Sequence, residues 1–208
     1  MNKKTKFSKS VNEKVDSSKT YTLDEAISII NQLKEITLAN GATGARIGML
    51  GSGNNVGKLV VLQFFENMGD IESAYDALLE SPLLKKAQES GKFSILYREV
   101  QKVIYDFGTH LSAQAKYVVL TIGTADDPAL DTISKFADVL TSNGAISGRY
   151  GPITIGDKAD GRTFLFGASY PSLSAMESAY DAVAADGIAA ELYKLVSVKK
   201  RQVVRLIN

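Results

Sequence analysis

The chain has 208 residues, of which 45% are hydrophobic and 23% charged, a composition typical of a globular protein with a sizeable core. A formal net charge of +1 argues against a nucleic acid as partner. The chain has no cysteine, which excludes disulfides and thiolate metal sites, and no apolar run of about 18 residues, so we expect no membrane partner and a cytoplasmic location.

Residues 1–20 predict a flexible basic tail, because Lys and Ser dominate and apolar residues are few. Two roles stay open for this tail: it keeps the protein in solution, or it contacts an acidic partner. The first predicted helix runs from Thr22 to Ala39. Glu25 stands at the capping-box distance from Thr22, and apolar residues recur with helical period.

Two apolar runs, 45–50 and 58–65, are joined by a Gly- and Asn-rich turn and predict a β-hairpin. A helix is expected from Asp70 to about Ser90, with a break or restart at Pro82. Residues 93–105 predict a further strand. This first half has no convincing opening strand, so that strand is short or absent.

The second half predicts a complete unit in the order β-α-β-β-α-β, which is the ferredoxin-like pattern. Its elements are expected at 117–122, 127–142, 149–155, 162–169, 172–194 and 196–207.

A duplicated passage links the two halves. GATGARIGMLG followed by IESAYDA in residues 41–77 matches GAISGRYGPIT followed by MESAYDA in residues 144–182. Gly41 and Gly144 are 103 residues apart, and Tyr75 and Tyr180 are 105 apart. Such a repeat predicts two similar units, which we place at residues 21–108 and 116–208.

The predicted strands 58–65 and 162–169 are apolar on both faces. Helices cover one face, so the other face must be buried as well. The predicted fold class is therefore α+β, with two tandem ferredoxin-like (βαββαβ) units packed sheet to sheet as an intrachain dimeric α/β barrel.

The element order, the GARIG and SGRYG segments and the repeated ESAYDA helix resemble the dimeric α/β barrel superfamily in a tandem, fused form, over residues 21–208. Similar members include NIPSNAP-like proteins, EthD-like proteins and antibiotic-biosynthesis monooxygenases. The resemblance implies a small-molecule-binding barrel, with the ligand between sheet and helices or inside the barrel. It also implies a cofactor-independent monooxygenase or isomerase acting on an apolar or aromatic compound. The alternative is a non-catalytic structural or protein-interaction module.

No catalytic motif of the superfamily matches this sequence, so the catalytic residues stay unknown and we expect no cofactor. The sequence contains no cluster of histidine and carboxylate residues that would indicate a metal site, so we expect no bound metal. His110 falls in the connector between the copies, where a structural role is favoured over haem ligation. A homo-oligomer is one option that the sequence leaves open.

The candidate ligand-binding residues come from two observations. The repeated cations of the hairpin could clamp an anion or pair with an acidic side chain. On the face opposite the helices, the second copy has the small residues Gly167 and Ser169 where the first copy has Gln63 and Phe65. Small residues opposite large ones either leave a cavity or interdigitate. The resulting set is Arg46, Arg149, Gln63, Phe65, Tyr97, Tyr150 and Ser169.

Two further features of the repeated helix stay open. Tyr75 and Tyr180 are either core residues or pocket-lining hydroxyls. The paired carboxylates Glu72/Asp76 and Glu177/Asp181 either form a solvated face, pair with an arginine, or act as general acid and base.

Overall fold

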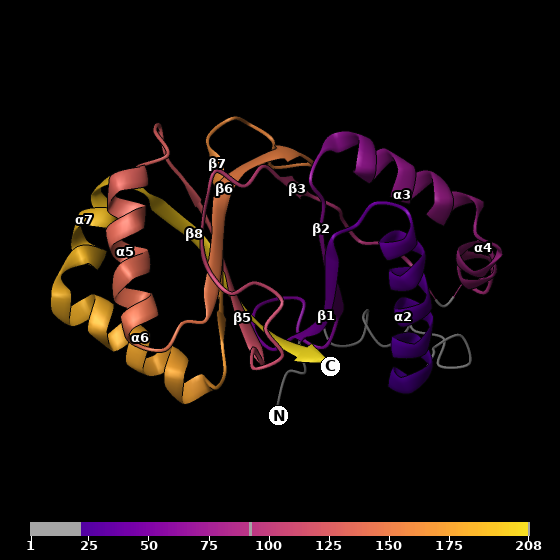
Figure 1. The fold of residues 1–208 in the computed structure, drawn as a ribbon, viewed down its shortest axis with the longest axis horizontal. Helices are drawn as coiled ribbons and strands as arrows, with labels where there is room; N and C mark the ends of the chain where they lie inside the picture. Colours follow the sequence, from indigo (N-terminus) through magenta and orange to yellow (C-terminus); the bar gives the residue numbers. More distant parts are fainter. Residues whose placement is uncertain (1–21, 92, 208) are drawn as a thin grey trace, which may run out of the picture. The chain divides into compact units, whose positions relative to one another are not determined.

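The computed structural model describes residues 22–91 and 93–207 (Figure 1). The predicted tail at 1–20 lies outside the described residues. Contacts divide the chain into two compact units, Met1–Gly44 with Gln63–Leu96, and Ala45–Leu62 with Tyr97–Asn208. None of the helices in the described part has the length and apolar character needed to cross a lipid bilayer.

The first unit is built from three helices: α2 (Leu23–Ala39), α3 (Met68–Glu80) and α4 (Pro82–Glu89). Thr22 and Glu25 form the predicted capping box, in which each side chain accepts a hydrogen bond from the other residue's backbone. The long helix predicted from Asp70 is divided at Ser81 and Pro82, as the proline indicates. Leu33, Leu78 and Leu84 form the buried centre of this unit.

The second unit contains an eight-stranded sheet. The strands run in the order β2-β1-β8-β5-β7-β6-β3, and β4 pairs with β6 beside β3. Their bounds are β1 Gly44–Leu50, β2 Leu59–Phe64, β3 Val100–Gln101, β4 Tyr105–Gly108, β5 Tyr117–Thr124, β6 Ser147–Ile155, β7 Thr163–Tyr170 and β8 Ser197–Ile207.

The second copy of the repeat has the ferredoxin-like strand order. Its four strands β5, β6, β7 and β8 lie as β8-β5-β7-β6 and are antiparallel throughout. Helices α5 (Leu130–Ser142), α6 (Leu173–Asp186) and α7 (Ile188–Leu195) cover one face of these strands (Figure 1). Phe136, Phe166 and Tyr170 are among the residues buried between helices and sheet. The predicted α+β class with two tandem ferredoxin-like copies is confirmed.

The last strands of each copy pair with the hairpin of the other copy, an arrangement we call the strand exchange, although β8 also keeps its pairing with β5 of its own copy. The last strand of the second copy, β8, pairs with β1, the first strand of the first copy's hairpin. The last strands of the first copy, β3 and β4, pair with β6, the matching hairpin strand of the second copy. The copies therefore join through backbone hydrogen bonds along strand edges, which the packing argument from sequence did not include.

This exchange explains two glycines of the repeat. A Cβ on Gly151 would lie 2.9 Å from the Lys102 carbonyl carbon, and a Cβ on Gly48 would lie 2.9 Å from the Arg205 carbonyl oxygen. Side chains do not fit at such distances. Gly48 and Gly151 are thus required because the exchanged strand crosses each of them closely.

Two predicted elements differ from the structure. The strand predicted at 93–105 is wrong for its first part, because regular pairing begins only at Val100 and its register shifts between Val100 and Gln101. The helix predicted at 172–194 is interrupted at Gly187, whose φ of 89° ends α6 in the left-handed conformation.

Candidate functional site

A row of four side chains crosses the second unit's sheet on the face that the helices cover. Arg201 on β8 is paired with Thr121 on β5, Thr121 with Phe166 on β7, and Phe166 with Tyr150 on β6. Directly paired residues point to the same side of a sheet. Phe166 and Tyr150 are buried against the helices, so Arg201 and Thr121 face the helices as well.

A groove of about 520 Å³ opens between α6 and strands β5 and β8. This volume lies in the range of small-molecule sites, about 300–1,000 Å³. Apolar side chains form much of its wall, and Arg201, Glu177 and Asp181 bring charge to it. The lining residues are Val119, Leu173, Ser174, Met176, Glu177, Tyr180, Asp181, Arg201 and Val203.

The Arg201 side chain is exposed in this groove and held by three contacts. Its Nε donates to Thr121 Oγ1 at 3.3 Å, and its Nη2 donates to the Tyr193 hydroxyl at 3.4 Å. The guanidinium carbon lies 4.8 Å from the centre of the Tyr180 ring, a cation–π distance. A solvent-reachable cation is thus fixed in position at the groove wall.

The ionisation of Arg201 follows from the same neighbours. Partial burial lowers its pKa, but the hydrogen bond to Tyr193 and the electrostatic interactions with Tyr180, Tyr193 and Tyr170 raise it more, so the net shift is upward. Arg201 therefore stays positively charged across the physiological range. The site can stabilise an anion or a developing oxyanion.

Tyr180 and Tyr170 are neighbours of the Arg201 guanidinium. Burial raises the pKa of the half-buried Tyr180, and the Arg201 charge opposes that shift without cancelling it. Tyr170 is fully buried, and its hydroxyl lies near that of Tyr180 without a hydrogen bond of good geometry. Both phenols remain protonated at neutral pH.

A small pocket of about 30 Å³ adjoins the groove, and Tyr180 and Arg201 line both spaces. Most of its wall is apolar, including Ile133, Phe136, Phe164, Phe166, Leu192 and Val196. Tyr150 also lines it; this residue is 2% exposed and its hydroxyl has no hydrogen-bond partner. Burial, followed by the charge of Asp127, raises the pKa of Tyr150.

Of the predicted ligand-binding residues, Tyr150 lines this pocket. The face predicted for Tyr150, opposite the helices, is wrong. Tyr150 is paired with Phe166 and stacks on Phe164, with ring centres 5.4 Å apart, so it belongs to the helix-covered face. The sequence did not settle that face because β6 is apolar at positions on both sides.

The other predicted residues of the second unit lie in separate places. Arg46 donates through Nη2 to the Ser112 carbonyl at 2.6 Å, and burial lowers its pKa. The ring of the half-exposed Tyr97 lies 5.7 Å from the Lys158 ammonium. Arg149 is paired with Gly167 on the face away from the helices.

In the first unit, Gln63 donates to the Thr37 hydroxyl at 3.0 Å, and Phe65 packs edge-to-face on Tyr75. Neither residue lines the groove or the pocket described above. The seven residues therefore do not form one pocket, and ligand contacts for the six outside it stay predictions.

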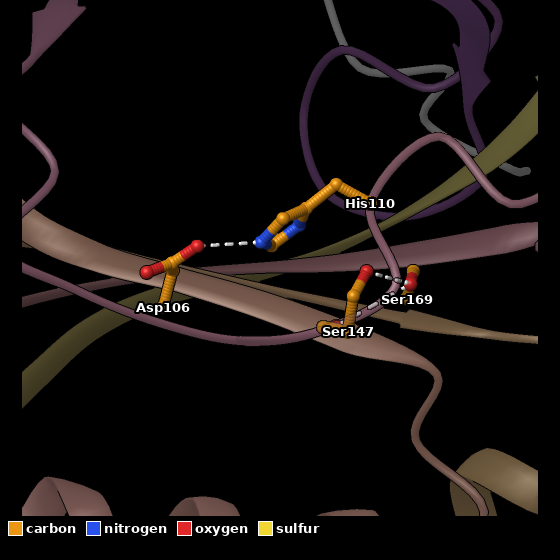
Figure 2. Close-up of polar contacts among 4 residues, drawn as sticks. All are labelled: Asp106, His110, Ser147 and Ser169. Atoms are coloured by element: carbon orange, nitrogen blue, oxygen red, sulfur yellow. Dashed lines mark hydrogen bonds and ion pairs between the residues drawn. The ribbon is translucent and has the colours of Figure 1, made fainter.

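Ser169 and His110 form two distinct polar pairs (Figure 2). The Ser169 hydroxyl lies 2.8 Å from that of Ser147, while His110 Nε2 turns to Asp106 Oδ2 at 2.7 Å. His110 makes no hydrogen bond to either serine in the described structure, so these residues do not form a nucleophile–base pair.

The donor set does not fit a haem or a metal ion. The groove and pocket are lined by no histidine, and His110 is held by Asp106 elsewhere. Within residues 22–91 and 93–207, no group of three or more His, Asp or Glu side chains is placed to bind a metal.

Sequence reasoning missed Arg201, Tyr193 and Thr121. A usable signal exists in the sequence: REVQKVI at 98–104 matches RQVVRLI at 201–207 at the repeat spacing of 103, which aligns Arg98 with Arg201. Each copy thus has a tyrosine in ESAYDA and an arginine at the matching position near its end, Arg98 in the first copy and Arg201 in the second.

Solved structures with a similar fold carry related descriptions. An anthrone oxidase-like protein is 13% identical with a TM-score of 0.53, covering 91% of this chain and 88% of that one. A "putative monooxygenase" from Fusobacterium nucleatum subsp. nucleatum is 10% identical with a TM-score of 0.58, covering 89% and 86%. A heme-binding protein from Thermus thermophilus is 9% identical with a TM-score of 0.50, covering 89% and 80%. At these identities the likeness shows the fold, and it agrees with the dimeric α/β barrel superfamily that the sequence resembles.

No protein with a curated functional description matches this sequence. One family model, described as "Domain of unknown function (DUF6854)", matches twice, at residues 15–103 and 115–206. The two matches fall on the two copies of the internal repeat and together span most of the chain. The chain therefore belongs to the DUF6854 family, with two copies of its domain in tandem.

Proposed function

We propose that the groove between α6 and strands β5 and β8 binds a flat, largely apolar aromatic compound with an acidic or ketonic oxygen. We further propose that the protein oxidises this compound with dioxygen and without a bound cofactor. The observation that carries the proposal is Arg201, an exposed cation held over Tyr180 in a mostly apolar groove of about 520 Å³.

The groove suits the ligand class in two ways. Val119, Val203, Leu173 and Met176 offer an apolar surface to a ring system. Arg201 offers a planar donor for an oxyanion, and Thr121 and Tyr193 already hold its orientation, so little side-chain freedom is lost on binding. The fold likeness to an anthrone oxidase-like protein supports an aromatic ketone as ligand.

The proposed reaction needs only an acidic CH₂ group next to the aromatic system. A groove carboxylate, Glu177 or Asp181, removes one proton, and the negative charge moves to the ligand oxygen, where Arg201 stabilises it. The carbanion transfers electrons to dioxygen and forms a C–O bond. Loss of water then leaves a ketone, so that CH₂ and O₂ become C=O and H₂O with nothing left over.

Calorimetry with anthrone as the probe, in buffer free of oxygen, tests binding. Arg201→Gln is expected to weaken anthrone binding about tenfold, the effect of one charge-assisted hydrogen bond, and to leave the binding of anthracene, which lacks the oxygen, unchanged. Arg205→Gln is the matched control, because it removes the same charge from the same strand outside the groove. Equal affinities of wild type and Arg201→Gln for anthrone would contradict the proposal.

A further inference from the structure

The small pocket beside Arg201 has too little volume for an aromatic ligand. Its volume of about 30 Å³ exceeds the ~10–15 Å³ that one water-sized molecule requires. It therefore has room for one diatomic molecule or a pair of waters. An aromatic ring bound in the groove would remain outside it.

The walls of the pocket are chiefly aromatic and aliphatic. The Thr121 and Tyr193 hydroxyls at its edge each accept a hydrogen bond from Arg201. Tyr150 also lines the pocket, and its buried hydroxyl has no hydrogen-bond partner in the described structure.

We propose that this pocket is a dioxygen site, with Tyr150 as the hydrogen-bond donor to the oxygen being reduced. This inference rests on the proposed oxidation. Tyr180 and Arg201 separate the pocket from the groove and line both, so dioxygen in the pocket lies next to the position of an oxyanion held by Arg201.

The Tyr150 hydroxyl is buried without a hydrogen-bond partner in the described structure. A buried donor left without a partner costs about 1–3 kcal/mol relative to a bonded one. Burial raises the pKa of this hydroxyl, so it keeps its proton at neutral pH. As dioxygen accepts electrons from the deprotonated ligand, its oxygen becomes a strong acceptor, and the Tyr150 hydroxyl donates to it.

Xenon tests the pocket without any reaction, since it occupies small apolar cavities. In crystals of the whole chain under xenon pressure, we expect one xenon among Phe166, Tyr150 and Val196. Val196→Ile adds one methylene to this wall and should abolish xenon binding, whereas Tyr150→Phe should retain it. Val60→Ile makes the same change in a different cluster and should not affect xenon.

The rate of anthrone oxidation gives the second readout. Val196→Ile is expected to raise the KM for dioxygen at least fivefold with the KM for anthrone unchanged, and Tyr150→Phe to lower kcat about tenfold at saturating dioxygen. An ordered water on Tyr150 that xenon does not displace, or an unchanged KM for dioxygen in a folded Val196→Ile protein, would overturn the proposal. In either case, anthrone binding measured in the absence of oxygen would still support the groove as the ligand-binding site. Xenon binding without any anthrone binding would contradict the proposed function and the dioxygen role together.

Discussion

The close crossing of exchanged strands over Gly151 yields a stability prediction with a defined size. In Gly151→Ala, the new Cβ would lie 2.9 Å from the Lys102 carbonyl carbon and 3.2 Å from the Ile104 nitrogen. Both are backbone atoms, so the exchanged strand itself must move. Such overpacking costs about 1–3 kcal/mol.

The displacement also strains two backbone hydrogen bonds, from Lys102 N to Pro152 O at 3.0 Å and from Ile104 N to Tyr150 O at 2.9 Å. Each contributes about 1 kcal/mol. We therefore expect Gly151→Ala to lower the free energy of unfolding by about 3 kcal/mol. For a chain of this size, that corresponds to a fall in Tm of roughly 6–12 °C.

Gly167→Ala is the matched control in the neighbouring strand β7. Its Cβ would meet only the Leu120 Cδ2 atom at 3.4 Å, an ordinary contact. Alanine also suits a strand better than glycine by roughly 0.5–1 kcal/mol, so this variant should be as stable as wild type or slightly more stable. Urea unfolding of both variants measures the difference. A Gly151→Ala protein within about 0.5 kcal/mol of wild type would refute the crossing of strands as the reason for this glycine.

Three further predictions concern single residues. Thr22→Ala removes the capping box of α2 and should cost about 1 kcal/mol in urea unfolding; no change would mean that the cap does not form. Ala129 has a φ of 53° at the start of α5, so Ala129→Gly should stabilise by about 1 kcal/mol, whereas Ala184→Gly inside α6 should destabilise by a similar amount. Burial holds the pKa of Tyr150 above the ordinary value of 10.0, so its contribution to stability is present below pH 10 and lost as the pH rises further. Tyr150→Phe should therefore reduce the alkaline loss of stability measured by urea unfolding at pH 9 and pH 11, and an unchanged loss would count against this burial.

The repeat made the architecture predictable. Matched glycines and ESAYDA segments indicated two ferredoxin-like copies, and the complete pattern of the second copy predicted its strand order. Local signals also worked at Thr22 and Pro82, where capping and proline chemistry act within a few residues. The strand exchange was not predictable, because strand partners far apart in the sequence leave no local signal.

The site was less predictable for a related reason. The sequence argument placed the cavity beside Gly167 and Ser169, using residue size on one face. The structure places a groove on the opposite face, where α6 leaves Arg201 and Val203 of β8 uncovered. That opening depends on the position of a helix over the sheet. The sizes of the residues in the strands do not predict this position. Tyr180 was recognised as a residue with two roles, and Arg201 gives its pocket-lining role a physical basis.

A crystal structure of the chain soaked with anthrone in the absence of oxygen would show whether the groove is the ligand site. We expect anthrone in the groove against α6, with its oxygen within hydrogen-bond distance of the Arg201 guanidinium. Anthrone bound instead on the face of Gly167 and Ser169, or absent at saturating concentration, would contradict this expectation.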